Sequence, residues 1–319
     1  LERCCQESPP TQCEELIETI AEVRGVPVRN VAVSSGSSSL MFSLLPQLLD
    51  ERSRVLLLSP MYGEYSHILQ HVIGCHITYF VLEDANGFAI DADDLISQAR
   101  EHDAVILVNP NSPTGVYCES MADIVSSIAR SNNPGSQCKM IWVDETYINY
   151  LPDAVSLEPL CGSLPELVVC KSMSKCYALS GLRVAYAVSQ NMATLRRFIP
   201  PWAVSLPGQL AAVAALRNDA YYAQQYEVIH SERRKMQQAL DDLGFQVFSG
   251  VANYLLTYLP AASGYSSTRF IEACREQGLF VRDAQNMGVL LPNNAVRFAV
   301  RSPEENEKML SIVDAILAS

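Results

Sequence analysis

A lysine among serine hydroxyls follows a short apolar run in the middle of the chain. The run 168–170 leads into Ser172, Ser174 and Lys175, and Arg183 lies eight residues beyond that lysine. A lysine near the end of a buried strand and close to a second cation has a lowered pKa, so its amine can attack a carbonyl group. The same residues also fit an exposed loop, which is where most lysines lie.

A carboxylate ends a second apolar run. Residues 140–143 lead into Asp144 and Glu145, and Tyr147 follows three residues after Asp144. A carboxylate at the end of a buried strand is costly unless a cation or several hydrogen-bond donors meet it. Asp144 therefore needs a partner, and a structural ion pair is the alternative to a functional site.

Serine and glycine residues follow the apolar run 31–33. Ser35, Gly36 and Ser37 precede a helical pattern over 38–49. Free backbone N–H groups and the positive end of a helix dipole together attract an anion such as a phosphate. A serine-rich helix cap that binds no ligand gives the same pattern.

Polar residues in a proline-held loop and near the C-terminus extend the candidate site. The run 105–108 leads into the loop of Asn111, whose amide can donate to a ligand or only form a turn. Residues 296, 298 and 300 are apolar and share one face of a predicted strand, which puts Arg297 on the other face. Arg297 either clamps a substrate carboxylate or faces solvent, and Arg282 is a candidate for a second anionic group.

Short apolar runs alternate with helical patterns and predict the fold. The predicted strands are 31–33, 54–58, 77–82, 104–108, 139–143, 167–170 and 182–188, and helices are predicted at 38–49, 62–73, 93–100 and 121–129. Strands that alternate with helices form a mostly parallel sheet of α/β type, covered on both faces. Ligands of such sheets bind beyond the carboxyl ends of the strands, which is where the polar residues lie.

The C-terminal third has a different pattern. A long linking helix is predicted over about 209–243, followed by runs at 245–248, 254–258, 279–282 and 296–300 and helices at 267–277 and 303–317. We expect a large domain over 10–220 and a small α+β domain over 221–319.

Composition excludes several classes of protein. The 319 residues include 23 basic and 35 acidic side chains, a net charge of −12, without a basic block for nucleic acid. No apolar run approaches the ~20 residues of a membrane span. The 10 cysteines contain no CxxC pair and favour reduced thiols in a cytoplasm. His67 and His71 fit a solvated helix face better than a metal site, and the first residue, Leu1, indicates a trimmed chain.

The motifs together resemble the class I/II aminotransferase family of pyridoxal-phosphate enzymes, which has the aspartate-aminotransferase-like fold type I. The resemblance runs from about residue 14 to the C-terminus and is strongest to histidinol-phosphate aminotransferase and threonine-phosphate decarboxylase. It rests on the segments 35–37, 60–62, 109–115, 144–147, 172–175 and 181–183 and on Arg297. It implies pyridoxal 5′-phosphate as cofactor and a homodimer with active sites at the subunit boundary.

The resemblance also implies a role for each site residue. Lys175 forms the Schiff base with the cofactor and moves the substrate proton, Asp144 pairs with the pyridine nitrogen, and Tyr147 binds the phenolic oxygen. Tyr62 stacks on the ring. The implied phosphate-binding residues are Ser35, Gly36, Ser37, Ser172, Ser174 and Arg183, and the implied substrate-binding residues are Arg297 and Arg282.

The chain departs from the family pattern at two places. The family loop has Asn where this chain has Ser112, so the phenolic oxygen is contacted by Ser112, by Asn111, or more weakly. Relatives also supply a Tyr from an N-terminal arm, whereas no Tyr precedes Tyr62. Either the arm is missing from this chain or the contact is absent.

The leading hypothesis is an aminotransferase that uses pyridoxal phosphate to transfer an amino group between an amino acid and a 2-oxo acid. The alternative is a decarboxylase of a phosphorylated amino acid, because segments 201–204 and 281–283 look closer to threonine-phosphate decarboxylase. A non-catalytic ligand-sensing domain is disfavoured, since every main cofactor residue except the loop Asn is present.

Overall fold

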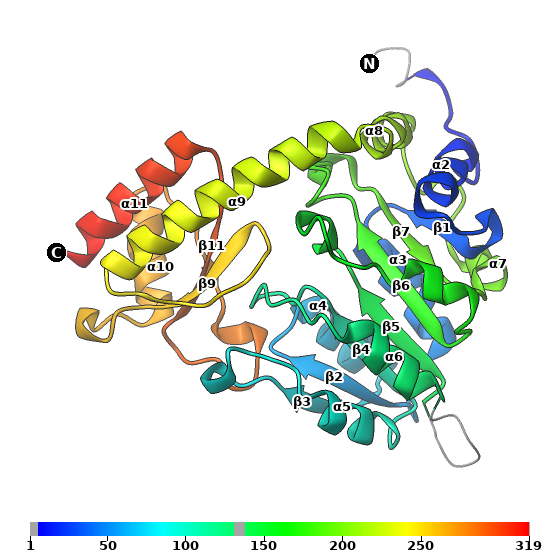
Figure 1. Cartoon of the computed structure of the whole chain (residues 1–319), viewed down its shortest axis with the longest axis horizontal. Helices are drawn as coiled ribbons and strands as arrows, with labels where there is room; N and C mark the ends of the chain where they lie inside the picture. The colour runs from blue at the N-terminus through cyan, green and yellow to red at the C-terminus, as the bar shows by residue number, and fades with distance from the viewer. Residues whose placement is uncertain (1–5, 131–137, 319) are drawn as a thin grey trace.

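A seven-stranded sheet forms the larger part of the molecule (Figure 1). The computed structural model describes residues 6–130 and 138–318. The strand order is β1-β7-β6-β5-β4-β2-β3, and only β7 runs antiparallel to its neighbours. The mostly parallel α/β sheet predicted from the sequence is therefore confirmed. Its strands are β1 (Val31–Ser34), β2 (Arg54–Ser59), β3 (His76–Val81), β4 (Ala104–Val108), β5 (Met140–Asp144), β6 (Leu167–Ser172) and β7 (Ala185–Val188).

Helices cover the sheet and explain why its central strands are apolar throughout. Every residue of β4, β5 and β6 is buried, as expected for strands that pack against helices on both faces. The covering helix α6 buries residues spaced three and four apart, so one face meets the core. The helices of this part include α2 (Glu14–Arg24), α3 (Ser37–Leu48), α4 (Gly63–His67) with the π-helical turn η2 (Ile68–Ile73), α5 (Ala92–Ala99) and α6 (Met121–Arg130).

The strand directions bring distant segments to one edge of the sheet. Strands β2, β4, β5 and β6 are mutually parallel. Strand β1 is antiparallel to β7, which is antiparallel to β6, so β1 also runs parallel to β6. The carboxyl ends of all five strands thus lie at the same edge, together with the residues that precede β7.

A second, four-stranded sheet has the order β10-β11-β9-β8 and its own hydrophobic cluster. Phe245, Phe270 and Phe298 meet edge to face in this cluster. The predicted strand 279–282 is wrong except at its last residue, which begins the short β10. Residues 279–281 form no strand. The elements are β8 (Gln246–Val247), β9 (Tyr254–Tyr258), β10 (Arg282–Asp283), β11 (Ala295–Ala299), α10 (Ser267–Glu276) and α11 (Pro303–Leu317).

The long linking helix predicted over 209–243 is two helices. Helix α8 (Leu206–Leu216) is mostly apolar and packs on α2, whereas α9 (Asp219–Asp242) extends to the second sheet and contacts α11 (Figure 1). Arg217 and Asn218 leave helical geometry between them. A single straight helix could not pack along α2 and also reach the second sheet. The predicted domain boundary at 220/221 falls just inside α9 and remains a prediction.

Within the described residues, no helix is long and apolar enough to span a bilayer. Their eight cysteines are all free thiols, and all but Cys118 are buried. The rings of His67 and His71 lie 5.3 Å apart, and the described chain contains no group of three or more His, Cys, Asp or Glu side chains placed to hold a metal ion.

Candidate active site

A cavity of about 320 Å³ opens at the carboxyl edge of the large sheet. Residues from both sheets line it, because Arg282 and Arg297 come from β10 and β11. The predicted residues that line the cavity are Ser37, Tyr62, Ser112, Asp144, Tyr147, Ser172, Ser174, Lys175, Arg183, Arg282 and Arg297. Three predicted residues, Ser35, Gly36 and Asn111, are not among its lining residues.

The loop after β4 turns Ser112 toward the cavity and Asn111 away from it. The Asn111 amide donates to the Pro60 carbonyl oxygen at 3.1 Å, and its Oδ1 accepts from the Thr114 hydroxyl at 2.9 Å. The Asn111 side chain is 3% exposed, and these two hydrogen bonds hold the loop in place. Of the two side chains considered from the sequence, only Ser112 lines the cavity, and the strength of its contact with the phenolic oxygen stays a prediction.

Gly36 and Arg183 form a close pair at the edge of the cavity. Gly36 has a φ of +93°, and a Cβ on it would lie 2.5 Å from Arg183 Nη2. Arg183 itself has a left-handed φ of 53° and donates through Nη1 to Ser174 Oγ at 3.3 Å. The first residues of α3, whose backbone N–H groups have no helical partner, lie in the same cavity. These donors form a cradle for an anion.

Gly36→Ala should weaken phosphate binding because the added methyl group displaces the Arg183 guanidinium. We expect the dissociation constant of pyridoxal phosphate to rise about tenfold or more, since charge-assisted hydrogen bonds are among the strongest in proteins. Fluorescence titration of the apoprotein measures it. Gly264→Ala is the matched control, because Gly264 has a φ of +67° and nothing within 4 Å of its Cβ position. Unchanged affinity in Gly36→Ala would contradict this cradle.

Asp144 is a buried carboxylate without a charged partner among the described residues. It is 5% exposed, and burial raises its pKa. Its Oδ1 accepts from the Thr146 backbone N–H and its Oδ2 from the Tyr65 hydroxyl, each at 2.9 Å. These neutral donors offset part of the burial cost, and the side chain still faces the cavity. The site therefore suits a cationic or N–H donor group of a ligand.

Lys175 follows β6 and extends into the same cavity. Its amine makes no hydrogen bond or ion pair with any residue that the structure describes, and burial together with Arg297 and Arg183 lowers its pKa. A lowered pKa increases the fraction of neutral amine at a given pH, and only the neutral amine attacks a carbonyl carbon.

Tyrosine rings line the space between these charged groups. Tyr147 is buried and meets the Tyr254 ring edge to face at 5.1 Å, while Tyr62 is 38% exposed and burial raises its pKa to about 12. The Arg297 guanidinium lies 4.7 Å above the Tyr254 ring and donates to Ser112 Oγ at 3.2 Å. Strand pairing sets Arg282 directly beside Arg297. Two cationic side chains thus lie together on one wall of the cavity.

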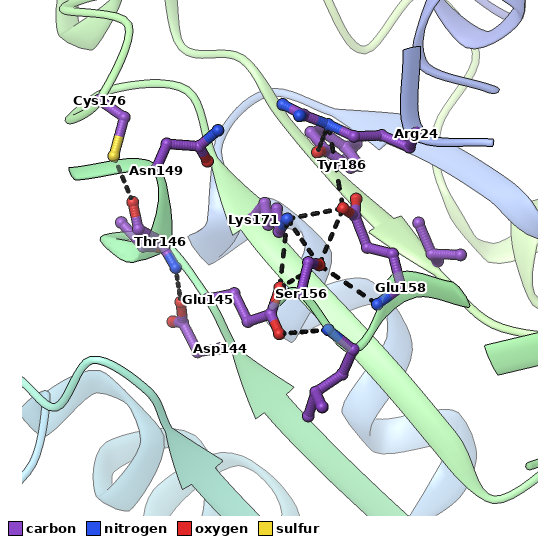
Figure 2. A network of polar contacts seen from close by, with 12 residues as sticks. Arg24, Asp144, Glu145, Thr146, Asn149, Ser156, Glu158, Lys171, Cys176 and Tyr186 are labelled. Atoms are coloured by element: carbon purple, nitrogen blue, oxygen red, sulfur yellow. Dashed lines mark hydrogen bonds and ion pairs between the residues drawn. The ribbon is translucent and has the colours of Figure 1, made fainter. Parts of the chain in front are cut away.

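A buried ion network lies next to this site (Figure 2). Lys171 Nζ lies 2.6 Å from Glu158 Oε2 and 3.1 Å from Glu145 Oε2, and Arg24 Nε lies 3.9 Å from the same Glu158 oxygen. The ion pair considered for Asp144 is therefore made by its neighbour Glu145. Because Lys171 directly precedes Ser172, the network joins the ends of β5 and β6 that hold the site.

Lys171→Met should destabilise the apoprotein by about 3–5 kcal/mol, because it leaves Glu145 buried without its cation and Glu158 with only the more distant Arg24. Urea denaturation followed by circular dichroism measures the change. Arg301→Met is the control: Arg301 and Glu305 form an ion pair in which both side chains are more than half exposed, and losing it should cost less than about 1 kcal/mol. Equal losses in the two variants would contradict the account of the network.

The comparisons with known proteins identify the family of this chain. Residues 2–313 match the family model "Aminotransferase class I and II". The chain belongs to that aminotransferase family. The family depends on pyridoxal phosphate, which is therefore the cofactor of this chain.

Two curated relatives show how close the likeness is. Histidinol-phosphate aminotransferase 2 of Archaeoglobus fulgidus is 30% identical over 97% of this chain and 84% of its own length. Threonine-phosphate decarboxylase of Salmonella typhimurium is 27% identical over 98% of this chain and 84% of its own length.

A solved structure supports the fold. Histidinol-phosphate aminotransferase from Sinorhizobium meliloti, solved in complex with pyridoxal-5′-phosphate, superposes with a TM-score of 0.83 at 19% identity over 99% of this chain and 85% of that one. The aspartate-aminotransferase-like fold type I is thereby confirmed.

Sequence reasoning missed Tyr65, Trp142 and Tyr254, which contact the site residues. Trp142 and Tyr254 lie in segments for which only a strand was predicted, and Tyr65 lies in a segment for which only a helix was predicted. Alternation from Asp144 was the available signal for Trp142, because residues two apart on a strand share a face. No local pattern marks Tyr65 or Tyr254, which reach the site from other elements.

Proposed function

We propose that this aminotransferase binds pyridoxal phosphate in the cavity at the carboxyl edge of the large sheet and transfers an amino group between an amino acid and a 2-oxo acid. One observation carries the proposal: the Lys175 amine, which has no partner among the described residues, and the buried Asp144 carboxylate, which has no charged partner among them, face the same cavity as an anion cradle. The cofactor needs these three groups. The residues present therefore fit it.

The chemistry of each residue suits it to a different part of the cofactor. Gly36, Ser37 and Ser174 with Arg183 suit the phosphate, with Ser172 beside them, and Asp144 suits the ring nitrogen. Tyr147 and Ser112 suit the phenolic oxygen, and Tyr62 suits the ring face. Gly36 does not line the cavity but lies against Arg183, whereas Ser35 does not line the cavity and is left out of this assignment. When bound, the cofactor supplies an electron sink for the carbon–hydrogen bond that must break.

Lys175 is proposed to bind the cofactor and then to act as acid and base. Its lowered pKa increases the fraction of neutral amine at a given pH, and the neutral amine can accept a proton at the substrate Cα and return it at a different atom. Arg183 and Arg297 are the cations that disfavour a charge on Lys175. Tyr147 lines the cavity and packs against the buried Tyr254 ring, and this aromatic wall limits water at the reacting atoms.

Arg297 and Arg282 are proposed to select the substrate. Arg297 is fixed by the Tyr254 ring and by Ser112, so its guanidinium is ready to bind the substrate carboxylate. Arg282 is exposed in the same cavity and adds a second positive charge. The pair favours an amino acid with a second anionic group.

Arg297→Ala should raise the substrate KM about 100-fold while leaving cofactor bound, because Arg297 is proposed to clamp the substrate carboxylate and holds no part of the cofactor in this assignment. Steady-state kinetics with each candidate amino acid and 2-oxoglutarate measures this. Arg301→Ala is the control, since Arg301 pairs with Glu305 at the surface and is absent from the cavity lining. An unchanged KM in Arg297→Ala would contradict the proposal that Arg297 binds the substrate carboxylate.

Decarboxylation of a phosphorylated amino acid is the second candidate, favoured by Arg282 in the cavity and by the Salmonella relative. Which bond breaks depends on which one is held perpendicular to the cofactor ring. Incubating the holoenzyme with amino acids plus 2-oxoglutarate separates the two reactions: glutamate accumulates in transamination, and carbon dioxide in decarboxylation.

A homodimer in the cytoplasm is proposed as the working state. Free thiols at all eight described cysteines suit a reducing compartment. Phe42 is 43% exposed on α3, the helix whose first residues line the cavity, and an exposed aromatic ring beside a site suits a subunit contact. Light scattering of the holoenzyme tests this state; a monomer at all concentrations would contradict it.

A further inference from the structure

The Tyr65 hydroxyl links Trp142 to Asp144. Trp142 and Asp144 are two residues apart on β5 and so point to the same face, while Tyr65 comes from α4, after β2. Tyr65 Oη lies 2.9 Å from Trp142 Nε1 and 2.9 Å from Asp144 Oδ2. Tyr65 and Trp142 have no exposed surface, so water does not compete for these contacts.

The direction of both hydrogen bonds is fixed by chemistry. An indole N–H can only donate, so the Tyr65 oxygen accepts from Trp142. The single Tyr65 proton is then left for Asp144 Oδ2. The other carboxylate oxygen, Oδ1, accepts from the Thr146 backbone N–H. Both oxygens of Asp144 are thus oriented by neutral donors, and the indole makes the tyrosine a better donor by polarising its hydroxyl.

The relay favours the ionised form of Asp144. Burial raises the pKa of Asp144, whereas the bonds from Thr146 and Tyr65 lower it. Burial also raises the pKa of Tyr65, so the hydroxyl keeps its proton near neutral pH. A carboxylate that is kept ionised leaves the proton on any basic nitrogen that it contacts.

We propose that Trp142 and Tyr65 are positioning residues for the cofactor ring, which hold Asp144 ionised and aimed so that the ring nitrogen keeps its proton. This inference rests on the proposed function, because it requires the ring nitrogen to contact Asp144. Neither residue touches the reacting atoms; they act through the carboxylate.

The surroundings of Asp144 contain few groups that could imitate this effect. Among the described residues, five titratable side chains interact electrostatically with Asp144. They are Tyr62 before α4, Tyr65 within α4, Tyr147 after β5, Cys170 on β6 and Tyr254 on β9. Burial raises the pKa of each, so all stay neutral near pH 7. The cations that line the same cavity are Lys175, Arg183, Arg282 and Arg297, and Arg297 also acts on Tyr147 and Tyr254.

The test uses holoenzyme reconstituted with pyridoxal phosphate labelled with ¹⁵N in the ring. The ¹⁵N chemical shift reports protonation of the ring nitrogen and is recorded from pH 6 to 9 for wild type, Tyr65→Phe and Asp144→Asn. We expect Tyr65→Phe to move toward the unprotonated value, in the direction of Asp144→Asn. Its kcat should fall about tenfold with little change in KM, as for loss of one hydrogen bond to a charged group.

Two further variants make the result specific. Tyr258→Phe removes a hydroxyl that donates to a different carboxylate, Asp84, at 3.0 Å, and should keep the wild-type ¹⁵N shift. Trp142→Phe leaves the Tyr65–Asp144 bond but weakens its donor, so its shift should lie between wild type and Tyr65→Phe.

The outcomes separate the inference from the proposed function. A wild-type ¹⁵N shift and pH profile in Tyr65→Phe, with a changed shift in Asp144→Asn, would overturn the relay and leave the cofactor site intact. An unchanged shift in Asp144→Asn would overturn the placement of the ring nitrogen and the relay with it.

Discussion

Lys175→Ala is expected to purify without the visible absorbance of bound pyridoxal phosphate and to lose transamination by about 10⁴-fold or more. The variant lacks both the amine that binds the cofactor aldehyde and the general base for the substrate proton, and a positioned base alone contributes about 10²–10⁴-fold. Absorbance spectra after cofactor addition and single-turnover kinetics measure the two losses separately.

The control for this variant is Lys308→Ala, which removes an exposed lysine on α11 that does not line the cavity. It should keep the wild-type spectrum and rate. The pH dependence adds a second check: cofactor uptake by the apoprotein should reach its plateau below pH 10.5, the ordinary lysine pKa, because burial and two arginines lower the pKa of Lys175. A plateau at or above pH 10.5 would contradict the proposed environment.

Asp144→Asn is expected to lower kcat by about 10³-fold, because the ring nitrogen loses the anion that stabilises its proton and the electron sink weakens. The cofactor should also dissociate on dialysis more readily than from wild type. The substitution keeps the size of the side chain, and the cavity shape is unchanged. Stopped-flow half-reactions measure the effect on the chemical step, and a rate within threefold of wild type would contradict it.

The apoprotein of Asp144→Asn should gain relative stability as pH rises. Burial raises the pKa of Asp144 in the folded state, so the folded protein binds its proton more tightly than the unfolded chain. Wild type therefore loses stability as pH rises from the unfolded value of 3.8 through the folded pKa, whereas Asn does not titrate. Urea denaturation midpoints of both proteins at pH 4 and pH 7 measure the stability of Asp144→Asn relative to wild type at each pH.

The sequence indicated much of the site because chemistry and strand ends coincide. Asp144, Ser172 and Lys175 follow runs whose continuous apolarity already predicted buried parallel strands, and sheet topology then brings those ends together. Arg297 was found by alternation, because its neighbours at 296 and 298 are buried in β11.

Other features of the site and the fold could not be predicted from the sequence, because they depend on contacts between segments far apart in the chain. Whether Asn111 or Ser112 faces the cavity is decided by the hydrogen bond from Asn111 to Pro60, fifty-one residues away. The break between α8 and α9 is set by packing on two different partners rather than by a Gly or Pro at 217–218. Glu145 pairs with Lys171 because β5 and β6 are neighbours.

The most direct measurement asks which lysine holds the cofactor. The chain has five lysines, at positions 139, 171, 175, 235 and 308. Reducing the holoenzyme with sodium borohydride and mapping its peptides by mass spectrometry locates the phosphopyridoxyl group. The account predicts the label on Lys175 in wild type and no label in Lys175→Ala. A label on another lysine, or none in wild type loaded with cofactor, would contradict it.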